Sequence, residues 1–415
     1  MNKIDHFRAL AADRLPARNR PAPTTWTLHS IAMATRDFGR ITAAVSAAAA
    51  EQLHAEGFAV CDNILGQDWA LALLAEQKAL VEAGLMREHK FQFGRGQFRK
   101  PHIYEADMHD TALRDDPRHS TPEIDAFFSA QPLATALNAR LPLLALTPEP
   151  ERATLKFQYN AGGGGCFPCH YDNAGAPNKR QVTCLFYFNQ AWKDGDGGEL
   201  ELTPFLRPAV RIAPLLDRAV LFLSDRVLHR VLPAAQPRYC FTVWIDGAAV
   251  NGPADTGLSA KDLGLDDSAV AALCASPKQR AVSRAVYAEE YATSLRECMG
   301  DSEGSTEMQQ SHAEHVAQQA GHKLLAPFVA GLRERKPVGS AATVIYDAHA
   351  APLEVRCGAC EVVLNCSSAD GGGGGCTYLR CSQCEDAAGA YCHEACQAKH
   401  WPTHRLECLR FLSKR

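Results

Sequence analysis

The chain has 415 residues, of which 46% are hydrophobic and 22% charged, and its formal net charge is −4. This length suggests two or three domains, and the composition is ordinary for a soluble globular protein. The small net charge provides no overall field that would favour nucleic acid or a membrane surface. No apolar run approaches the roughly 18 residues needed to span a bilayer, and the N-terminus has no apolar signal core, so we expect neither a membrane protein nor a secreted one.

Sixteen cysteines might suggest a disulfide scaffold. However, about half of them fall at paired spacings in the last part of the chain, and the others lie scattered among apolar residues. Paired spacings are typical of zinc-bound thiolates, and scattered cysteines of buried free thiols. The pattern therefore favours a reducing compartment.

Residues 1–150 precede the region that is expected to form the sheet. Residues 1–40 carry more Arg and Lys than acids, which is typical of a disordered leader or of an organelle transit peptide. Residues 41–150 are expected to form supporting helices, the first of which should stop at Gly57, and the sequence FAVCDNIL after it is expected to form a short buried strand. Within them, the aromatic, glycine-containing and basic stretch 91–108 fits two alternatives. It either borders a substrate site or forms a hairpin with a solvated face.

Residues 151–250 contain several short strand-like runs separated by Gly, Asp or Pro clusters, with no helical pattern between them. This arrangement favours an antiparallel sandwich or barrel over a parallel sheet. Residues 251–350 are mostly helical by composition, with a break near 300–305, and we interpret them as a helical connector. The tail, 351–412, is cysteine-rich and holds a run of five glycines.

A His-x-Asp pair, His170 and Asp172, stands near the start of the strand region. In a strand these two side chains share one face, so both can meet one metal ion. His229 follows an apolar strand and can supply a third ligand. Two histidines and one carboxylate form the face typical of non-haem Fe(II) oxygenases, because they leave coordination positions open. Two similar pairs, at 54–56 and 312–314, lie in helical sequence, where these positions point apart, and they are expected to be ordinary helix residues.

Arg238 opens the strand that follows His229. Oxygenases of this class need a co-substrate that supplies two electrons, and arginine binds the distal carboxylate of 2-oxoglutarate in a planar two-pronged way. Arg238, Cys240 and Thr242 would share one strand face, so Thr242 can join Arg238 at the carboxylate. The alternative is a surface arginine at the start of an exposed strand.

Several blocks of this region resemble one known family in the same order and at nearly the same spacing. They are YNAGGGGCFPCHYDN, RQVTCLFYFNQAW, GGELEL, DRAVLFLSDRVLHRVLPA and RYCFTVW. Together they resemble the Fe(II)/2-oxoglutarate dioxygenases of the prolyl 4-hydroxylase type, in particular the hypoxia-inducible-factor (EGLN-like) prolyl hydroxylases. The resemblance implies an α+β fold whose oxygenase core is a double-stranded β-helix, or jelly roll.

The resemblance also implies roles for single residues. His170, Asp172 and His229 would bind iron, and Arg238 would pair with the distal carboxylate of 2-oxoglutarate. The same resemblance implies roles for two tyrosines and one further arginine. Tyr187 and Tyr159 match tyrosines that hydrogen-bond the co-substrate, with ordinary aromatic core as their alternative, and Arg180 matches an arginine near the peptide entrance. Enzymes of this family use L-ascorbate as well.

Cys166 and Cys169 depart from the family's wording. A second metal on CFPCH is one interpretation of these cysteines. Two additional buried thiols are the interpretation that we prefer.

The tail carries eight Cys and His residues at zinc-ligand spacings. Zinc favours four tetrahedral Cys or His ligands, so eight ligands predict two closed sites. So small and apolar-poor a segment is expected to fold only with its metal. The candidate ligands are Cys357, Cys360, Cys381, Cys384, Cys392, Cys396, His404 and Cys408.

The end of this pattern, YC-x3-CQ followed by His and Cys, resembles a MYND-type zinc finger. That family crosses its ligand pairs. The resemblance implies one zinc on Cys357, Cys360, Cys392 and Cys396, and a second zinc on Cys381, Cys384, His404 and Cys408. The long gap after Cys360 holds Cys366 and Cys376, which leaves the second pair open, and His400 competes with His404.

The leading hypothesis is a 2-oxoglutarate-dependent hydroxylase of prolyl residues in a protein, with the finger recruiting a partner, such as a proline-rich one. The first alternative keeps the iron chemistry and changes the substrate. The second is a zinc-finger adaptor whose oxygenase fold is inactive; the complete triad and Arg238 argue against it. We expect no nucleic-acid partner and no membrane partner, and a cytoplasmic or nuclear protein, with organelle targeting by the leader left open.

Overall fold

The computed structural model describes two compact units, residues 1–345 and 346–415. The described residues of the first unit are 38–93, 96–149, 153–248, 257–300, 302, 304–337 and the strand 343–345. In the second unit the description covers four short strands, which form two antiparallel pairs: β13 (Val355–Arg356) with β14 (Val363–Leu364), and β15 (Leu379–Arg380) with β16 (Ala390–Tyr391). Residues 1–37 of the leader and all eight predicted zinc ligands lie outside the described residues.

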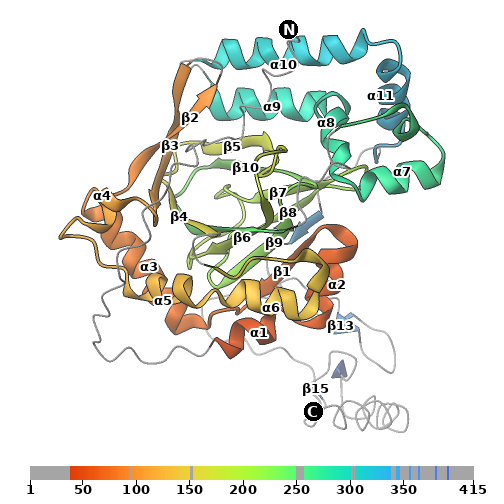
Figure 1. Cartoon of the computed structure of the whole chain (residues 1–415). Coiled ribbons are helices and arrows are strands. Elements are labelled where there is room, and N and C mark those ends of the chain that lie inside the picture. Colours follow the sequence, from red (N-terminus) through yellow and green to blue (C-terminus); the bar gives the residue numbers. More distant parts are fainter. Residues whose placement is uncertain are drawn as a thin grey trace, which may run out of the picture. The chain divides into compact units, whose positions relative to one another are not determined.

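Two sheets form the body of the first unit (Figure 1). The larger has the order β1-β9-β6-β11-β4-β3-β2 and the smaller the order β12-β8-β7-β10-β5. All pairings are antiparallel except that of β12 with β8. The larger sheet comprises β1 (Phe58–Asp62), β2 (Arg87–Phe93), β3 (Gly96–Asp107), β4 (Ala153–Asn160), β6 (Arg180–Tyr187), β9 (Arg218–Leu223) and β11 (Arg238–Asp246). The smaller sheet comprises β5 (Gly165–His170), β7 (Leu200–Pro204), β8 (Val210–Ile212), β10 (Val227–Ala234) and β12 (Thr343–Ile345).

Side chains of the larger sheet alternate between its two faces, and each face packs against a different neighbour. On β6, Leu185 and Tyr187 pack with residues of the smaller sheet, whereas Cys184 and Phe186 pack toward the N-terminal helices. Such a period of two is what a strand with two different neighbours requires. The predicted jelly-roll core is confirmed.

The N-terminal helices cover the outer face of the larger sheet (Figure 1). The helix α2 begins after Ser46, whose hydroxyl accepts the amide of Ala49, and ends at Gly57, where φ is 84°. A side chain at that φ would be strained, so glycine ends the helix as expected. The helices are α1 (Gly39–Ala44), α2 (Ala47–Glu56), α3 (Gln67–Glu82), α4 (Thr111–Arg114), α5 (Pro122–Ala130) and α6 (Pro132–Arg140). The region 41–150 is thus not only helical, because β1, β2 and β3 belong to it.

The interpretation of 251–350 as a connector is wrong for its described part. These helices pack on the smaller sheet and share a hydrophobic cluster with it. The amide of Cys169 donates to Ser294 Oγ at 3.0 Å, and Tyr171 Oη donates to Ser283 Oγ at 2.9 Å. The helices are α7 (Asp267–Cys274), α8 (Arg280–Val286), α9 (Ala288–Met299), α10 (Ser305–Ala320) and α11 (Leu325–Glu334). Their apolar faces need a partner, and the smaller sheet provides it.

Within the described residues, no helix combines the length and apolarity that crossing a bilayer requires.

Candidate metal centre and co-substrate pocket

The structure brings His170, Asp172 and His229 together. His170 ends β5 and lies directly opposite His229 on β10, and Asp172 follows two residues later. Asp172 Oδ1 lies 3.4 Å from His170 Nε2 and 3.6 Å from His229 Nε2. Two ligands that each lie about 2.1 Å from one ion are separated by about 3–4 Å, so the arrangement fits a single metal. Among the described residues, this is the one set of three or more His, Cys, Asp or Glu that converges in this way.

Hydrogen bonds at the far side of each ligand fix its orientation. His170 Nδ1 donates to Pro168 O at 2.8 Å, and His229 Nδ1 donates to Val227 O at 3.2 Å. Each Nε2 therefore keeps its lone pair for a metal. The two histidine rings face each other with centroids 4.2 Å apart.

The other oxygen of Asp172 accepts two hydrogen bonds that the sequence did not predict. Thr183 Oγ1 donates to Oδ2 at 2.7 Å, and Trp244 Nε1 donates to it at 2.9 Å. Both donors are buried. They hold the carboxylate so that Oδ1 points to the two histidines.

The charge states of Asp172 and His229 suit metal binding. Burial works to raise the pKa of Asp172, but the neighbouring His229 and His170 hold that pKa well below its usual value. Burial and the neighbouring His170 lower the pKa of His229 to about 4. At neutral pH the site therefore offers an ionised carboxylate and a neutral imidazole, which are the forms that bind a metal.

We expect Thr183→Val to weaken iron binding by about 10- to 100-fold, because it removes one of the two donors that orient Asp172 and keeps the shape of the side chain. Anaerobic Fe(II) titration measures the effect. The matched control is Ser224→Ala. Ser224 Oγ lies 2.8 Å from Thr183 Oγ1, and we expect a smaller effect from its removal. Equal losses in both variants would mean that Thr183 acts through packing.

Arg238 and Tyr187 lie together and are fully or almost fully buried. The Arg238 guanidinium carbon is 4.9 Å from the centroid of the Tyr187 ring. Arg238 Nε, Arg238 Nη2 and Tyr187 Oη have no hydrogen-bond partner among the described residues, while Arg238 Nη1 donates to Cys240 Sγ at 3.1 Å. Buried donors of this kind need a partner, and a carboxylate with two oxygens fits the guanidinium fork.

A glycine makes room for this arginine. Gly198, in the GGELEL block, has φ of 78°, and a Cβ at this position would lie 2.9 Å from Arg238 Cδ. Any side chain there would be strained and would press against the arginine stem. This is a physical reason for the second glycine of the block.

The predicted role of Tyr159 in binding the co-substrate is not supported, because the neighbouring residue occupies the pocket. Tyr159 stacks on Tyr239, with centroids 4.9 Å apart, against the helix-covered face of the larger sheet. Gln158 points to the other face and lines the cavity. Its Oε1 accepts a hydrogen bond from Thr242 Oγ1 at 3.1 Å. The predicted common face of Arg238 and Thr242 is present, and Gln158 joins it.

Gln158 and Thr242 line a cavity of about 350 Å³ together with the three metal-site residues, and this cavity extends well beyond them. Arg238 and Tyr187 are buried and do not belong to its lining. Its walls come from both sheets, from the β2–β3 hairpin and from helices α8, α9 and α10. The stretch 91–108 therefore fulfils both expectations, because it forms a hairpin and borders the cavity. Arg180 lies at this cavity with its guanidinium carbon 4.4 Å from the centroid of the Trp244 ring.

The two helical His-x-Glu pairs are not metal sites. His54 and Glu56 are exposed on α2. His312 is buried on α10, where its Nε2 donates to Ala288 O at 2.9 Å and its Nδ1 accepts from Arg284 Nε at 3.1 Å. Both of its ring nitrogens are thus occupied.

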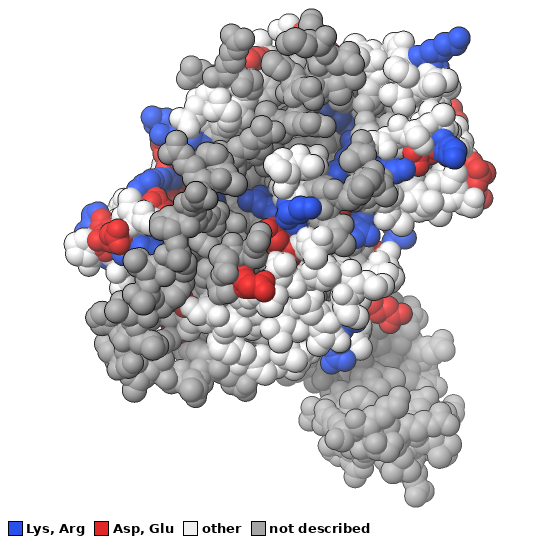
Figure 2. Space-filling view, in the orientation of Figure 1, with Lys and Arg blue, Asp and Glu red and all other residues white. Residues whose placement is uncertain are grey.

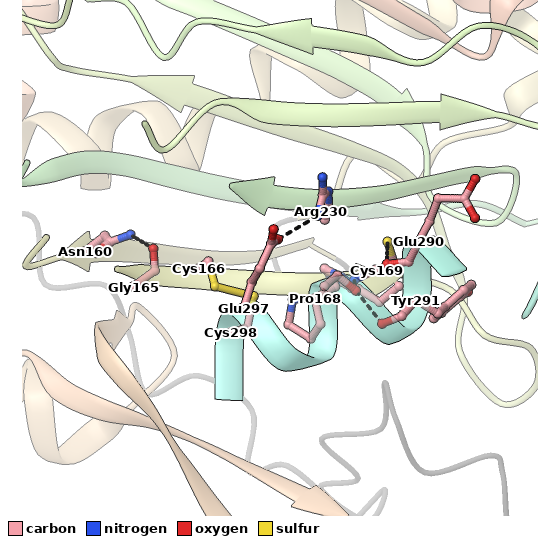
Figure 3. Close-up of a disulfide and its surroundings, with 12 residues drawn as sticks. Asn160, Gly165, Cys166, Pro168, Cys169, Arg230, Glu290, Tyr291, Glu297 and Cys298 are labelled. Carbon is pink, nitrogen blue, oxygen red and sulfur yellow. Dashed lines mark hydrogen bonds and ion pairs between the residues drawn. A yellow bond between two sulfur atoms is a disulfide. The ribbon is translucent and has the colours of Figure 1, made fainter. Parts of the chain in front are cut away.

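The expectation of two buried thiols at 166 and 169 is half wrong. Cys166 forms a disulfide with Cys298, which lies 132 residues later on α9. Figure 3 shows this bond between β5 and α9, next to the ion pair of Arg230 with Glu297 (2.8 Å). Cys169 is a buried free thiol, as expected. The disulfide attaches the C-terminal helices to the strand that ends in His170.

We expect Cys298→Ser to lower the free energy of unfolding by about 2–4 kcal/mol, because the disulfide closes a long loop and limits the unfolded chain. Denaturant unfolding with and without dithiothreitol measures this effect, and the variant should no longer respond to the reductant. The control is Cys274→Ser, which removes a half-buried free thiol on α7. An equal response of the wild type and Cys298→Ser to dithiothreitol would contradict the prediction.

Comparison with known proteins agrees with this geometry. The family profile of the 2OG-Fe(II) oxygenase superfamily matches residues 156–246. The MYND finger profile matches residues 374–408. The first match contains the three converging side chains and Arg238, whereas Cys357 and Cys360 precede the second match.

Three relatives are similar over larger spans. A crystal structure of prolyl 4-hydroxylases from Phytophthora capsici is 44% identical, covers 73% of this chain and 96% of that one, and superposes with a TM-score of 0.63. Prolyl hydroxylase EGLN3 of Mus musculus is 30% identical over 200 residues, which are 46% of this chain and 79% of the relative. The hypoxia-inducible factor prolyl hydroxylase of Caenorhabditis elegans is 29% identical over 212 residues, which are 45% of this chain and 26% of that longer protein. The chain therefore belongs to the prolyl hydroxylases of the 2OG-Fe(II) oxygenase superfamily, and it carries a MYND finger in addition.

Proposed function

We propose that this dioxygenase hydroxylates a prolyl residue in a protein or peptide. The observation that carries the proposal is the convergence of the three metal-site side chains in the wall of one cavity. Arg238, which has buried, unpartnered polar atoms, shares a strand face with Thr242, another residue of that wall. The prolyl hydroxylases that resemble the chain support the choice of substrate.

His170, Asp172 and His229 would hold Fe(II), and Arg238 with Tyr187 would hold the distal carboxylate of 2-oxoglutarate. When bound, iron and 2-oxoglutarate would supply the chemistry that splits O2: one oxygen atom hydroxylates a substrate C–H bond, and the other enters succinate as 2-oxoglutarate loses CO2. The protein fixes both groups in a largely apolar cavity and limits access of water. Arg180, beside Trp244 in the wall of the cavity, would contact the peptide.

The test uses peptides from a cell extract of a suitable host, incubated with active protein or with His170→Ala protein, together with Fe(II), 2-oxoglutarate and ascorbate. We expect new hydroxylated prolyl residues, found by mass spectrometry, only with the active protein. Hydroxylation on a different residue type would support the same chemistry on another substrate. Succinate formation should rise with the matching synthetic peptide and fall to background when its proline is replaced by alanine.

The adaptor alternative predicts no turnover with any peptide. The structure gives it no support, because the three ligands converge and the arginine is buried in place. Absence of succinate formation in the presence of Fe(II), ascorbate and varied peptides would favour the adaptor.

We propose further that the tail binds two zinc ions in the crossed arrangement and recruits a partner protein, such as a proline-rich one. The MYND match supports a zinc finger in this part of the chain. Metal analysis of the purified chain should give two zinc ions per molecule. Cys357→Ser should reduce that number to one, and Cys366→Ser should leave it at two.

A further inference from the structure

Lys100 is a buried lysine in the wall of the cavity, and it has no carboxylate partner among the described residues. It lies on β3, is 9% exposed and lines the same cavity as the metal ligands. Its ammonium nitrogen lies 3.8 Å from the centroid of the Phe167 ring and 5.6 Å from that of the Phe91 ring. Two aromatic faces stabilise a cation only in part, and a buried charge usually has an opposite charge beside it.

The acidic groups that line the cavity are already engaged. Glu105 accepts hydrogen bonds from His89 at 2.9 Å and from Lys156 at 3.1 Å. Asp172 is one of the three metal-site residues. The cavity lining therefore has an excess of positive charge, with six Lys and Arg against these two carboxylates: Lys90, Lys100, Lys156, Arg180, Arg280 and Arg284.

Burial lowers the pKa of Lys100 to about 7, although the charge of Glu105 works in the opposite direction. An anion brought into the cavity would restore the full charge of this lysine. Figure 2 shows Lys and Arg side chains gathered near the middle of the displayed face of the molecule.

The position of Lys100 relates it to the reacting part of the substrate. Phe167, which stacks under its ammonium group, is on β5 with His170, and the two rings have centroids 6.5 Å apart. One aromatic side chain thus separates the lysine from a metal ligand. In a bound peptide, a group at Lys100 would therefore belong to a residue close in sequence to the residue that reacts.

We propose that Lys100 forms a subsite for the carboxylate of an Asp or Glu near the target proline. The proposal rests on the proposed function and specifies its substrate as an acidic prolyl peptide. A single ammonium group on an aromatic wall matches a singly charged carboxylate. The distal carboxylate of the co-substrate is assigned to Arg238 in the proposed function, so Lys100 is assigned to the substrate.

The test measures binding, so that it does not depend on turnover. The chain is loaded with Mn(II) and 2-oxoglutarate without oxygen, and fluorescence anisotropy reports binding of labelled peptides. The host peptide has uncharged residues around one proline, and Glu or Gln is placed in turn at each of the neighbouring positions. We expect Glu at one or two positions to bind about 10- to 100-fold more tightly than Gln, as charge-assisted hydrogen bonds provide.

Lys100→Met should abolish this preference, and Lys100→Glu should invert it toward a peptide with Lys at the same position. The matched control is Arg99→Gln. Arg99 is the adjacent residue on β3, but it is 67% exposed in its side chain and pairs with Glu88 outside the cavity. The melting temperature of Lys100→Met should not fall, because the substitution removes a buried unpaired charge.

Two results would overturn the subsite: equal binding of Glu and Gln peptides at every position, or an unchanged preference in Lys100→Met. The proposed function fails in a different way. In that case the binding assay still shows the preference for Glu when Ala replaces the proline of the peptide. The turnover assay with Fe(II) and oxygen then shows no hydroxylation of any peptide.

Discussion

Asp172→Ala is expected to lose Fe(II) binding at micromolar metal and to lower succinate formation by more than about 100-fold. Asp172 is the one carboxylate of the site, so its removal leaves two imidazoles and no anionic ligand to offset the charge of the ion. It also leaves Thr183 and Trp244 with buried donors and no acceptor. Mutation of a residue that supports a ligand typically lowers metal affinity or activity by about 10- to 100-fold, and mutation of a direct ligand should lower it further. Anaerobic Fe(II) titration and a succinate assay measure both effects.

Two further variants define the cause. Asp172→Asn keeps the size of the side chain and removes its charge, so it should lose most of the affinity as well. Glu51→Ala removes an exposed carboxylate on α2 and should behave as the wild type. The assignment of the metal site would be wrong if Asp172→Ala bound Fe(II) with unchanged affinity.

The parts of the site that could be predicted from the sequence lie within single strands. Arg238 and Thr242 are separated by an even number of residues, so strand geometry places them on one face. The pair at 170 and 172 follows from the same period, and the apolar strand before His229 locates the third ligand. Local periodicity is sufficient here because each inference concerns a few consecutive residues.

The prediction for Tyr159 rests on a shared residue type and takes no account of the face of the strand. Phe157 and Tyr159 have the same parity, and Phe157 is completely buried beneath the helices. Their face is thus the helix-covered one. Gln158, of the opposite parity, had to point into the cavity, and alternation along ATLKFQYN was the pattern that could have revealed it.

Other features depend on contacts between distant segments. Thr183 and Trp244 reach Asp172 from two different strands, and Cys166 meets Cys298 across 132 residues. The pairing of strands in three dimensions decides these contacts, and no period in the sequence encodes it. The same reason explains why 251–350 was interpreted as a connector, since its partner surface lies about a hundred residues earlier.

Arg238→Met is expected to weaken 2-oxoglutarate binding by about 100-fold or more, because two charge-assisted hydrogen bonds to a buried carboxylate contribute about 1.5–3 kcal/mol each. Iron affinity should stay within a factor of about two, since the guanidinium does not touch the three metal-site residues. Isothermal titration of 2-oxoglutarate into the Mn(II)-loaded protein separates the two effects.

Arg238→Lys is the matched variant, because it keeps the charge and loses the planar fork. We expect its 2-oxoglutarate affinity to lie between those of the wild type and Arg238→Met, with Tyr187→Phe showing a smaller loss, since Tyr187 contributes one neutral hydroxyl. Gly198→Ala tests the same site through the position of Arg238, because the added methyl group would displace the arginine stem. This variant should raise the KM for 2-oxoglutarate and leave Fe(II) binding unchanged. If Arg238→Met bound 2-oxoglutarate as tightly as the wild type, the buried guanidinium would have a structural role and the co-substrate would bind at another place.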